Sequence, residues 1–190
     1  IETLEADTDN KLRPAETALD VYLADKEKNI AEARFLRAYF YWEMFLRYGP
    51  VPLVKQTLDP NGDLFTGYTD RPTIKEFLDY IVSEVKGCEA KLLDYQGTGE
   101  VDKPTARALY VRMLLYMASP RYASATGVTW QQVVDAAKGF IADFGDTFSL
   151  YTDATGGVSA YNNAWLMTPY QDNNKEVIFF RNDAAIGWSG

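Results

Sequence analysis

Aromatic and amide side chains gather in the C-terminal part of this 190-residue sequence. Tyr161, Trp165 and Trp188 occur in irregular sequence, and Asn162 and Asn163 directly follow the first of them. An exposed aromatic ring stacks on the apolar C–H face of a sugar, and neighbouring amides hydrogen-bond with the sugar hydroxyls. The pattern therefore indicates oligosaccharide binding. The candidate ligand-binding residues are Tyr161, Asn162, Trp165 and Trp188.

Another interpretation of the loop aromatics, and another candidate pair of residues, remain open. Aromatic side chains in loops also anchor those loops to a core, without any ligand. Phe65 and Tyr68, in the loop over residues 61–72, form a second and weaker candidate pair.

The residue types that most enzymes require are scarce. The sequence has no histidine, which removes the commonest general base and metal ligand. Its one cysteine, Cys88, lies in an apolar helical pattern and is expected to be a buried hydrophobic residue. Glu84, Glu89 and Asp94 follow a charged helix face, and no phosphate-binding or dinucleotide-binding glycine motif occurs. We expect a protein that is not an enzyme, with no catalytic residues, no metal site and no cofactor.

Composition excludes further classes. The formal net charge is −8, which argues against nucleic-acid partners because phosphate binding needs clustered Lys and Arg. Hydrophobic residues make up 47% of the chain, a globular proportion. No apolar run approaches the roughly 20 residues of a membrane span, and the sequence lacks the apolar region of a signal peptide at its start.

Hydrophobic periodicity predicts a series of helices. A short helix is expected over residues 15–25, separated by the polar stretch KEKN from a helix over 31–48. The second helix has two apolar faces, so we expect neighbours on both sides. Gly49 and Pro50 end it. One face carries Phe35, Ala38, Tyr39, Trp42, Phe45 and Leu46, and the other carries Ala33, Leu36, Phe40 and Met44.

Three more helices follow. Thr73 with Glu76 and Thr129 with Gln132 form capping boxes that start helices over residues 73–94 and 129–144. Between them, residues 103–120 form a second helix with apolar residues on two sides. Residues 176–182 are rich in β-branched and aromatic side chains and predict a short strand.

Arg34 and Arg37 interrupt the apolar surface of the 31–48 helix. A buried arginine must be paired. We therefore interpret both as structural buried polar residues that bind carboxylates or helix-end carbonyls, and a direct ligand clamp is the alternative.

Helices with two apolar faces alternate with helices that have one, which is typical of stacked antiparallel pairs. The predicted fold is all-α, with stacked antiparallel helical pairs over residues 1–150. An irregular segment with at most short strands follows over 151–190. A helical-repeat adaptor that binds only proteins would share this scaffold.

Several segments resemble one protein family. AEARFLRAYFYWEMFLRYGPVPLV (31–54) is similar to the signature helix of the SusD/RagB outer-membrane nutrient-binding lipoproteins. TIKEFLDYIVSEVKGCEAKLLD, KPTARALYVRMLLYMASPRY, WQQVVDAAKGFIADFGDTFSLY and NKEVIFFRND resemble later family segments, in the same order. The similarity covers roughly residues 15–182 and suggests that the chain is part of a longer protein.

The resemblance implies a fold, a function and a location. The implied fold is a tetratricopeptide-like helical scaffold over residues 1–150, and the irregular segment over 151–190 starts a variable ligand-facing lobe. Family members bind oligosaccharides, or in some cases peptides, and deliver them to a SusC-type TonB-dependent transporter. It implies a position on the extracellular face of the outer membrane, with membrane contact only through a lipid anchor whose cysteine is absent from this sequence. It does not identify the glycan.

Overall fold

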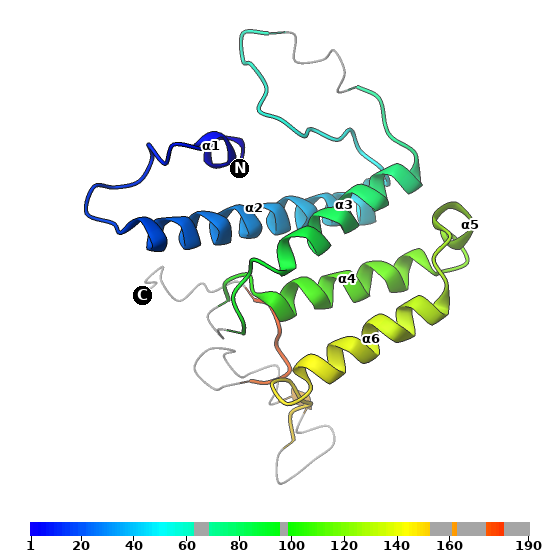
Figure 1. The fold of residues 1–190 in the computed structure, drawn as a ribbon. Helices are drawn as coiled ribbons and strands as arrows, with labels where there is room; N and C mark the ends of the chain where they lie inside the picture. The colour runs from blue at the N-terminus through cyan, green and yellow to red at the C-terminus, as the bar shows by residue number, and fades with distance from the viewer. Residues whose placement is uncertain (63–68, 96–98, 153–160, 163–173, 181–190) are drawn as a thin grey trace, which may run out of the picture.

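The computed structural model describes residues 1–62, 69–95, 99–152, 161–162 and 174–180. These residues form helices and no strand, so the all-α prediction is confirmed for them (Figure 1). The helices are α1 (Glu2–Ala6), α2 (Leu19–Tyr48), α3 (Ile74–Glu89), α4 (Lys103–Met117), α5 (Ala123–Thr126) and α6 (Trp130–Phe144).

The four long helices stack in chain order. Helix α2 packs on α3, α3 on α4 and α4 on α6, and each runs antiparallel to the one before it (Figure 1). The short helix α5 lies against α3, and α1 lies against the side of α2. This arrangement is the series of antiparallel helical pairs that the apolar periodicity predicts.

Helix α2 is longer than predicted. The sequence indicates a break at KEKN, yet one helix runs without interruption for 30 residues. Lys and Glu favour the helical conformation, and this stretch contains neither Gly nor Pro to end it. The predicted separate helix over 15–25 is therefore wrong, and its C-terminal half is the first turns of α2.

The core lies where α2, α3 and α4 meet. Trp42 is 1% exposed and packs against Phe45 and Tyr116, with ring centroids 5.9 Å and 5.3 Å away. Phe77 stacks on Phe45 from the α3 side. Helix α3 also buries Leu78, Ile81, Val85 and Cys88, which belong to the predicted apolar stripe of that helix.

Local signals set the helix ends as expected. Thr73 and Glu76 form a reciprocal capping box at the start of α3, and Thr129 and Gln132 form one at the start of α6. Gly49 ends α2 with a φ of 70°, a conformation that costs glycine little and other residues more. Each signal needs only a few neighbouring residues, which is why the sequence reveals it.

Two predicted apolar faces are not covered by the described residues. On α2, Phe40 is 59% exposed, and Leu36 and Met44 are each 37% exposed, although we expected neighbours on both sides of this helix. On α6, Ile141 is 66% exposed, and Val133 is the only residue of the helix that is buried. The stack covers one side of these helices and leaves the other open.

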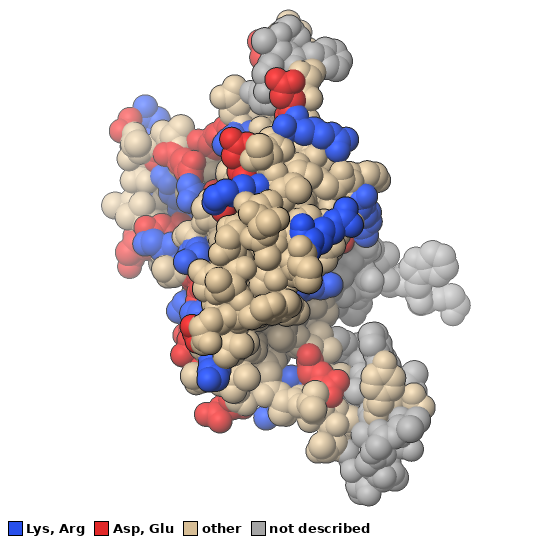
Figure 2. All heavy atoms as spheres, turned by 90° about the vertical axis from the view of Figure 1, so that its right-hand side faces the viewer, with Lys and Arg blue, Asp and Glu red and all other residues tan. Residues whose placement is uncertain are grey.

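The molecule also has a largely uncharged surface at the end where α5 lies. Figure 2 shows uncharged side chains down the middle of this face, with Lys and Arg side chains on both sides. The helix ends on this side carry the exposed aromatic residues Tyr48, Tyr116 and Trp130. Among the described residues, none of the helices combines the length and apolar character needed to cross a membrane.

The predicted strand is wrong for its described part. Residues 176–180 have no strand geometry, and no other described segment forms a ladder with them. They lie instead beside the N-terminal end of α4, as the orange segment of Figure 1 shows. Phe179 packs edge-on against Phe35 and Tyr39 of α2, with ring centroids 5.8 Å and 5.9 Å away. These apolar residues pack against helices and not against a second strand.

Candidate functional site

The structure describes two of the four candidate sugar-binding residues. Tyr161 is 64% exposed, and its neighbour Asn162 is also exposed. Trp165 and Trp188 lie outside the described residues, as do Asn163, Phe65 and Tyr68. The site as a whole therefore stays a prediction.

Asn174, an amide residue near this segment, has a structural role. Asn174 is 3% exposed, and its side-chain oxygen accepts a hydrogen bond from the backbone N–H of Glu176 at 3.1 Å. The Glu176 carboxylate in turn accepts from the backbone N–H of Tyr151 at 2.6 Å. Asn174 thus orders the turn that leads to residues 177–180 and is not an exposed sugar-binding amide.

Arg34 and Arg37 both bind carboxylates. Arg34 donates to Glu5 at 2.6 Å, and Arg37 donates to Glu84 through Nη2 and, at 3.0 Å, through Nε. The side chains of Arg34 and Arg37 are 37% and 24% exposed, so neither is buried as we expected. The reason is geometric, because both lie at the side of α2, between its core face and its open face.

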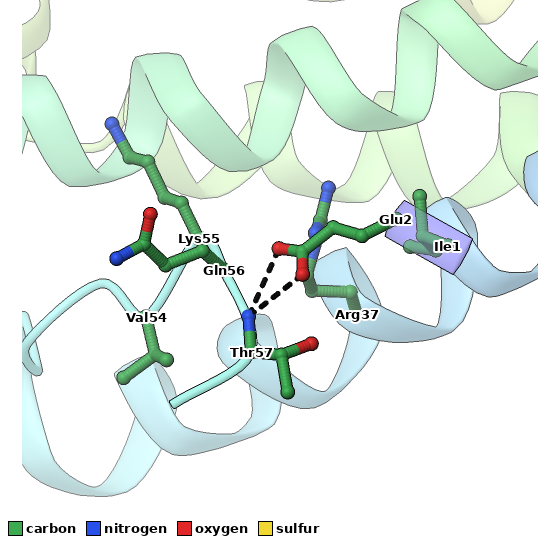
Figure 3. A pocket seen from close by; sticks show the side chains of 7 residues that line it. All are labelled: Ile1, Glu2, Arg37, Val54, Lys55, Gln56 and Thr57. Carbon is green, nitrogen blue, oxygen red and sulfur yellow. Dashed lines mark hydrogen bonds between the residues drawn. The ribbon is translucent and has the colours of Figure 1, made fainter. Parts of the chain in front are cut away.

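Arg37 also borders a hollow of about 210 Å³ between α1, α2 and residues 54–57 (Figure 3). Both carboxylate oxygens of Glu2 accept from the backbone N–H of Thr57, at 3.0 Å and 2.9 Å. The hydroxyl of Tyr41 accepts from the backbone N–H of Val54 at 2.8 Å. These bonds hold residues 54–57 against the first two helices.

The charged side chains of Glu2 and Arg37 at this hollow have partners within the chain. The hydrogen bond from the Thr57 backbone holds the pKa of the Glu2 carboxyl below its usual value. Burial opposes the charge on Arg37, but the hydrogen bond and charge of Glu84 outweigh it and raise the pKa of the guanidinium. Since Glu2 and Arg37 already have hydrogen-bond partners within the chain, the arrangement fits a structural joint better than a ligand site.

A second hollow, which we call the α2–α4 groove, has a volume of about 330 Å³. Tyr39 of α2 and Ala108 of α4 belong to its walls, and Phe179 contributes an aromatic ring from the C-terminal segment. The described residues that line it are Phe35, Tyr39, Thr105, Ala108, Leu109, Arg112, Ile178 and Phe179. A mostly apolar concave surface with few polar groups is typical of small-molecule sites.

The start of α4 fixes one end of this groove. Asp102, 2% exposed, caps the helix by accepting from the backbone N–H of Thr105 at 3.0 Å and from its hydroxyl at 2.6 Å. The Thr105 hydroxyl also lies 3.4 Å from the carbonyl oxygen of Ile178. Gly99 has a φ of 81°, and a Cβ there would lie 2.9 Å from the carbonyl oxygen of Phe180. Residues 178–180 are therefore packed closely on the polypeptide that enters α4.

Arg112 distinguishes the α2–α4 groove from the hollow at Arg37. Among the arginines of the described ranges, it is the one with no hydrogen bond, ion pair or ring contact. The arginines that do have partners are Arg13, Arg34, Arg37, Arg47, Arg71, Arg107 and Arg121. A guanidinium with its donors open, beside an apolar floor, can bind an anionic group.

Other reactive groups take no part in these hollows. Cys88 is 1% exposed, and burial raises the pKa of its thiol to about 12, so the reactive thiolate is disfavoured. Within the part of the chain that the structure describes, no three acidic or cysteine side chains gather as metal ligands would.

Sequence reasoning missed the α2–α4 groove. Tyr39 belongs to the predicted core face of α2, and residues 176–182 were expected to be a strand, so their meeting was not foreseen. One signal was present: Arg112 lies one helical turn from Ala108, a residue on one of the two apolar sides of the predicted 103–120 helix. A lone arginine on an apolar face warrants a search for an anionic partner.

The whole chain was then compared with known proteins. The sequence matches no protein-family model, and no curated protein matches it. Solved structures do match. A SusD-like protein from Bacteroides fragilis (BF3747) shares 27% identity over 67% of this chain, with a TM-score of 0.53.

A second protein gives a similar result. BT4246 shares 22% identity over 76% of the chain, with a TM-score of 0.59, and its selenomethionine form shares 23% identity with a TM-score of 0.55. The matched region makes up 22% of the BF3747 chain and 28% and 27% of the two BT4246 chains. This chain therefore spans only about a quarter of the length of the structures it matches.

Proposed function

The chain is a SusD-like protein, and we propose that it binds oligosaccharides at the cell surface without converting them chemically. The observation that carries this proposal is the similarity of its helical stack to the SusD-like protein from Bacteroides fragilis. The order of the sequence segments in the chain supports the same assignment. The exposure of Tyr161 beside Asn162 is compatible with a ring that stacks on a sugar.

The proposed site lies in the irregular segment over residues 151–190, and residues 1–150 act as its scaffold. Tyr161, Trp165 and Trp188 supply the stacking surfaces, and Asn162 supplies hydrogen bonds to sugar hydroxyls. The paired arginines Arg34 and Arg37 serve the scaffold and not the ligand.

The proposed partner is a SusC-type TonB-dependent transporter, and the proposed location is the extracellular face of the outer membrane. A binding protein of this kind must pass its ligand to a pore. The exposed apolar residues Leu36, Phe40 and Met44 of α2 offer a surface for protein contact. The same residues favour the second candidate function, a helical adaptor that binds only protein.

A polysaccharide affinity gel separates the two functions. The chain is run through native gels that contain neutral or acidic polysaccharides, beside a gel with none. Retarded migration in at least one polysaccharide supports oligosaccharide binding. Unchanged migration in all of them, together with recovery of an outer-membrane barrel on an immobilised chain, supports the adaptor.

A further inference from the structure

We propose that the α2–α4 groove is a binding site for a small carboxylate with an apolar or aromatic body, held by Arg112. This inference is argued separately from the proposed oligosaccharide function, because neither Tyr161 nor Asn162, the candidate sugar-binding residues that the structure describes, lines the groove.

The charge of the ligand follows from Arg112. Its guanidinium carries the one arginine charge without a partner in the described ranges, and it lines the groove. A planar guanidinium binds a carboxylate or a phosphate through two parallel hydrogen bonds. We choose the carboxylate because it is the smaller of the two groups and the walls of the groove are mostly apolar. The chain as a whole has a net charge of −8, so an anion is favoured only where a positive group is locally unpaired.

The body of the ligand follows from the walls. Phe35, Tyr39 and Phe179 form a cluster of rings with centroids about 6 Å apart, and Ala108 and Leu109 face them from α4. These residues remove apolar surface from water when a ring or branched aliphatic group enters. A volume of about 330 Å³ suits one aromatic side chain and its carboxylate.

The groove fits a sugar poorly. Besides Arg112, the described side chains of its lining offer only the hydroxyls of Tyr39 and Thr105, and the Thr105 hydroxyl already donates to Asp102 at 2.6 Å. A hexose would bring several hydroxyls into an apolar space, and each unsatisfied hydroxyl costs free energy. An acid with an apolar body places its charged group at Arg112 and brings fewer other polar atoms into the apolar space than a hexose does.

The test compares an acid with its uncharged amide analogue. N-acetyl-phenylalanine and N-acetyl-phenylalaninamide are titrated into the isotopically labelled chain and followed by backbone amide chemical shifts. We expect a dissociation constant on the order of 1 mM for the acid, as its size allows, and shifts at Ala108 and Arg112. The amide should bind about tenfold more weakly, because it cannot form the charged pair with Arg112.

Three variants locate the effect. Arg112→Gln should abolish the preference for the acid over the amide, and Arg121→Gln should keep it. Arg121 is the matched control, because its guanidinium lies over the ring of Tyr122, 5.4 Å from its centroid, and does not line the groove. Ala108→Leu should weaken both ligands by filling the space. Equal binding of acid and amide to the unaltered chain, or a preference that survives Arg112→Gln, would overturn the proposal.

Two further ligands identify the source of the acid. A tripeptide with a C-terminal phenylalanine that binds more tightly than N-acetyl-phenylalanine indicates a peptide C-terminus, and equal binding indicates a free acid. Both results support the site. Glucuronate that binds as tightly as N-acetyl-phenylalanine would contradict the apolar part of the proposal.

Discussion

Aromatic rings meet opposite environments in α2 and in the segment that contains Tyr161. Trp42 of α2 is 1% exposed and packs between other rings, whereas Tyr161 is 64% exposed. Both side chains can stack on a flat apolar surface. In α2 the Trp42 ring packs on a surface formed by other residues of the chain. Much of the Tyr161 ring, in contrast, faces solvent. The difference separates a ring used for folding from a ring accessible to a ligand.

Arginines show the same contrast. Arg37 is held by Glu84 at the junction of α2 and α3, whereas Arg112, beside the α2–α4 groove, has no partner among the described residues. A paired charge joins elements and adds little to recognition. A charge that folding leaves unpaired is available to an outside group. Substitution of a paired arginine should therefore change the stability of the fold, and substitution of an unpaired arginine should change ligand binding.

Trp42→Ala is expected to have the largest effect. Removal of this ring from a site that is 1% exposed should lower the free energy of unfolding by about 3–5 kcal/mol. Urea unfolding followed by circular dichroism measures the loss. Trp130→Ala is the matched control, because Trp130 is 56% exposed, and it should cost less than about 1 kcal/mol. Similar losses for both variants would show that burial does not decide the role of these rings.

Arg37→Gln is expected to have an intermediate effect. It leaves the Glu84 carboxylate, whose side chain is 13% exposed, without its charged partner. We expect a loss of about 1–3 kcal/mol, less than for a fully buried pair because both groups keep some contact with water. A second substitution, Glu84→Gln, should cost less in the Arg37→Gln background than in the unaltered chain. Additive losses would mean that the pair does not hold α2 to α3.

The capping box at Thr73 gives a smaller, pH-dependent effect. The hydroxyl and backbone N–H of Thr73 bind Glu76 and hold the pKa of its carboxyl below its ordinary value. Glu76 therefore stabilises the fold fully above its ordinary pKa, and this contribution is lost as the pH falls through its lowered pKa. We expect Thr73→Ala to reduce the melting temperature by about 2–4 °C at neutral pH.

The box at Thr129 is the control for that variant. Its partner, Gln132, does not titrate. The melting difference between the unaltered chain and Thr73→Ala should shrink between about pH 6 and about pH 3, whereas the difference for Thr129→Ala should stay constant. Parallel behaviour of the two variants would exclude Glu76 as the titrating group.

Local features could be predicted from the sequence, because they need few residues. The capping boxes, the stop at Gly49 and the buried stripe of α3 each depend on spacing within a few turns. The join of residues 19–48 into one helix was missed, because the polar KEKN stretch suggested a break even though its residues favour a helix. The open faces of α2 and α6 were also missed, since periodicity shows which face is apolar and not whether anything covers it.

Tertiary features were beyond sequence reasoning. The α2–α4 groove brings residues from α2, α4 and the 177–180 segment together, and no local pattern reports such a meeting. The strand prediction was wrong for the same reason. A strand must pair with a second strand, and these residues pack against two helices instead. The candidate sugar site rests on residue types in an irregular segment, of which the structure describes Tyr161 and Asn162 alone.

Oligosaccharide binding by Tyr161→Ala tests the central claim most directly. A sugar that retards the unaltered chain in an affinity gel is titrated calorimetrically into Tyr161→Ala and into Trp130→Ala, which also removes an exposed ring, but from the helical stack. We predict that Tyr161→Ala weakens binding by about tenfold, the scale of one well-placed aromatic contact, and leaves the melting temperature nearly unchanged. Trp130→Ala should bind as the unaltered chain does. Unchanged affinity in Tyr161→Ala, or a large drop in its melting temperature, would contradict the account, because the ring would then serve packing and not recognition.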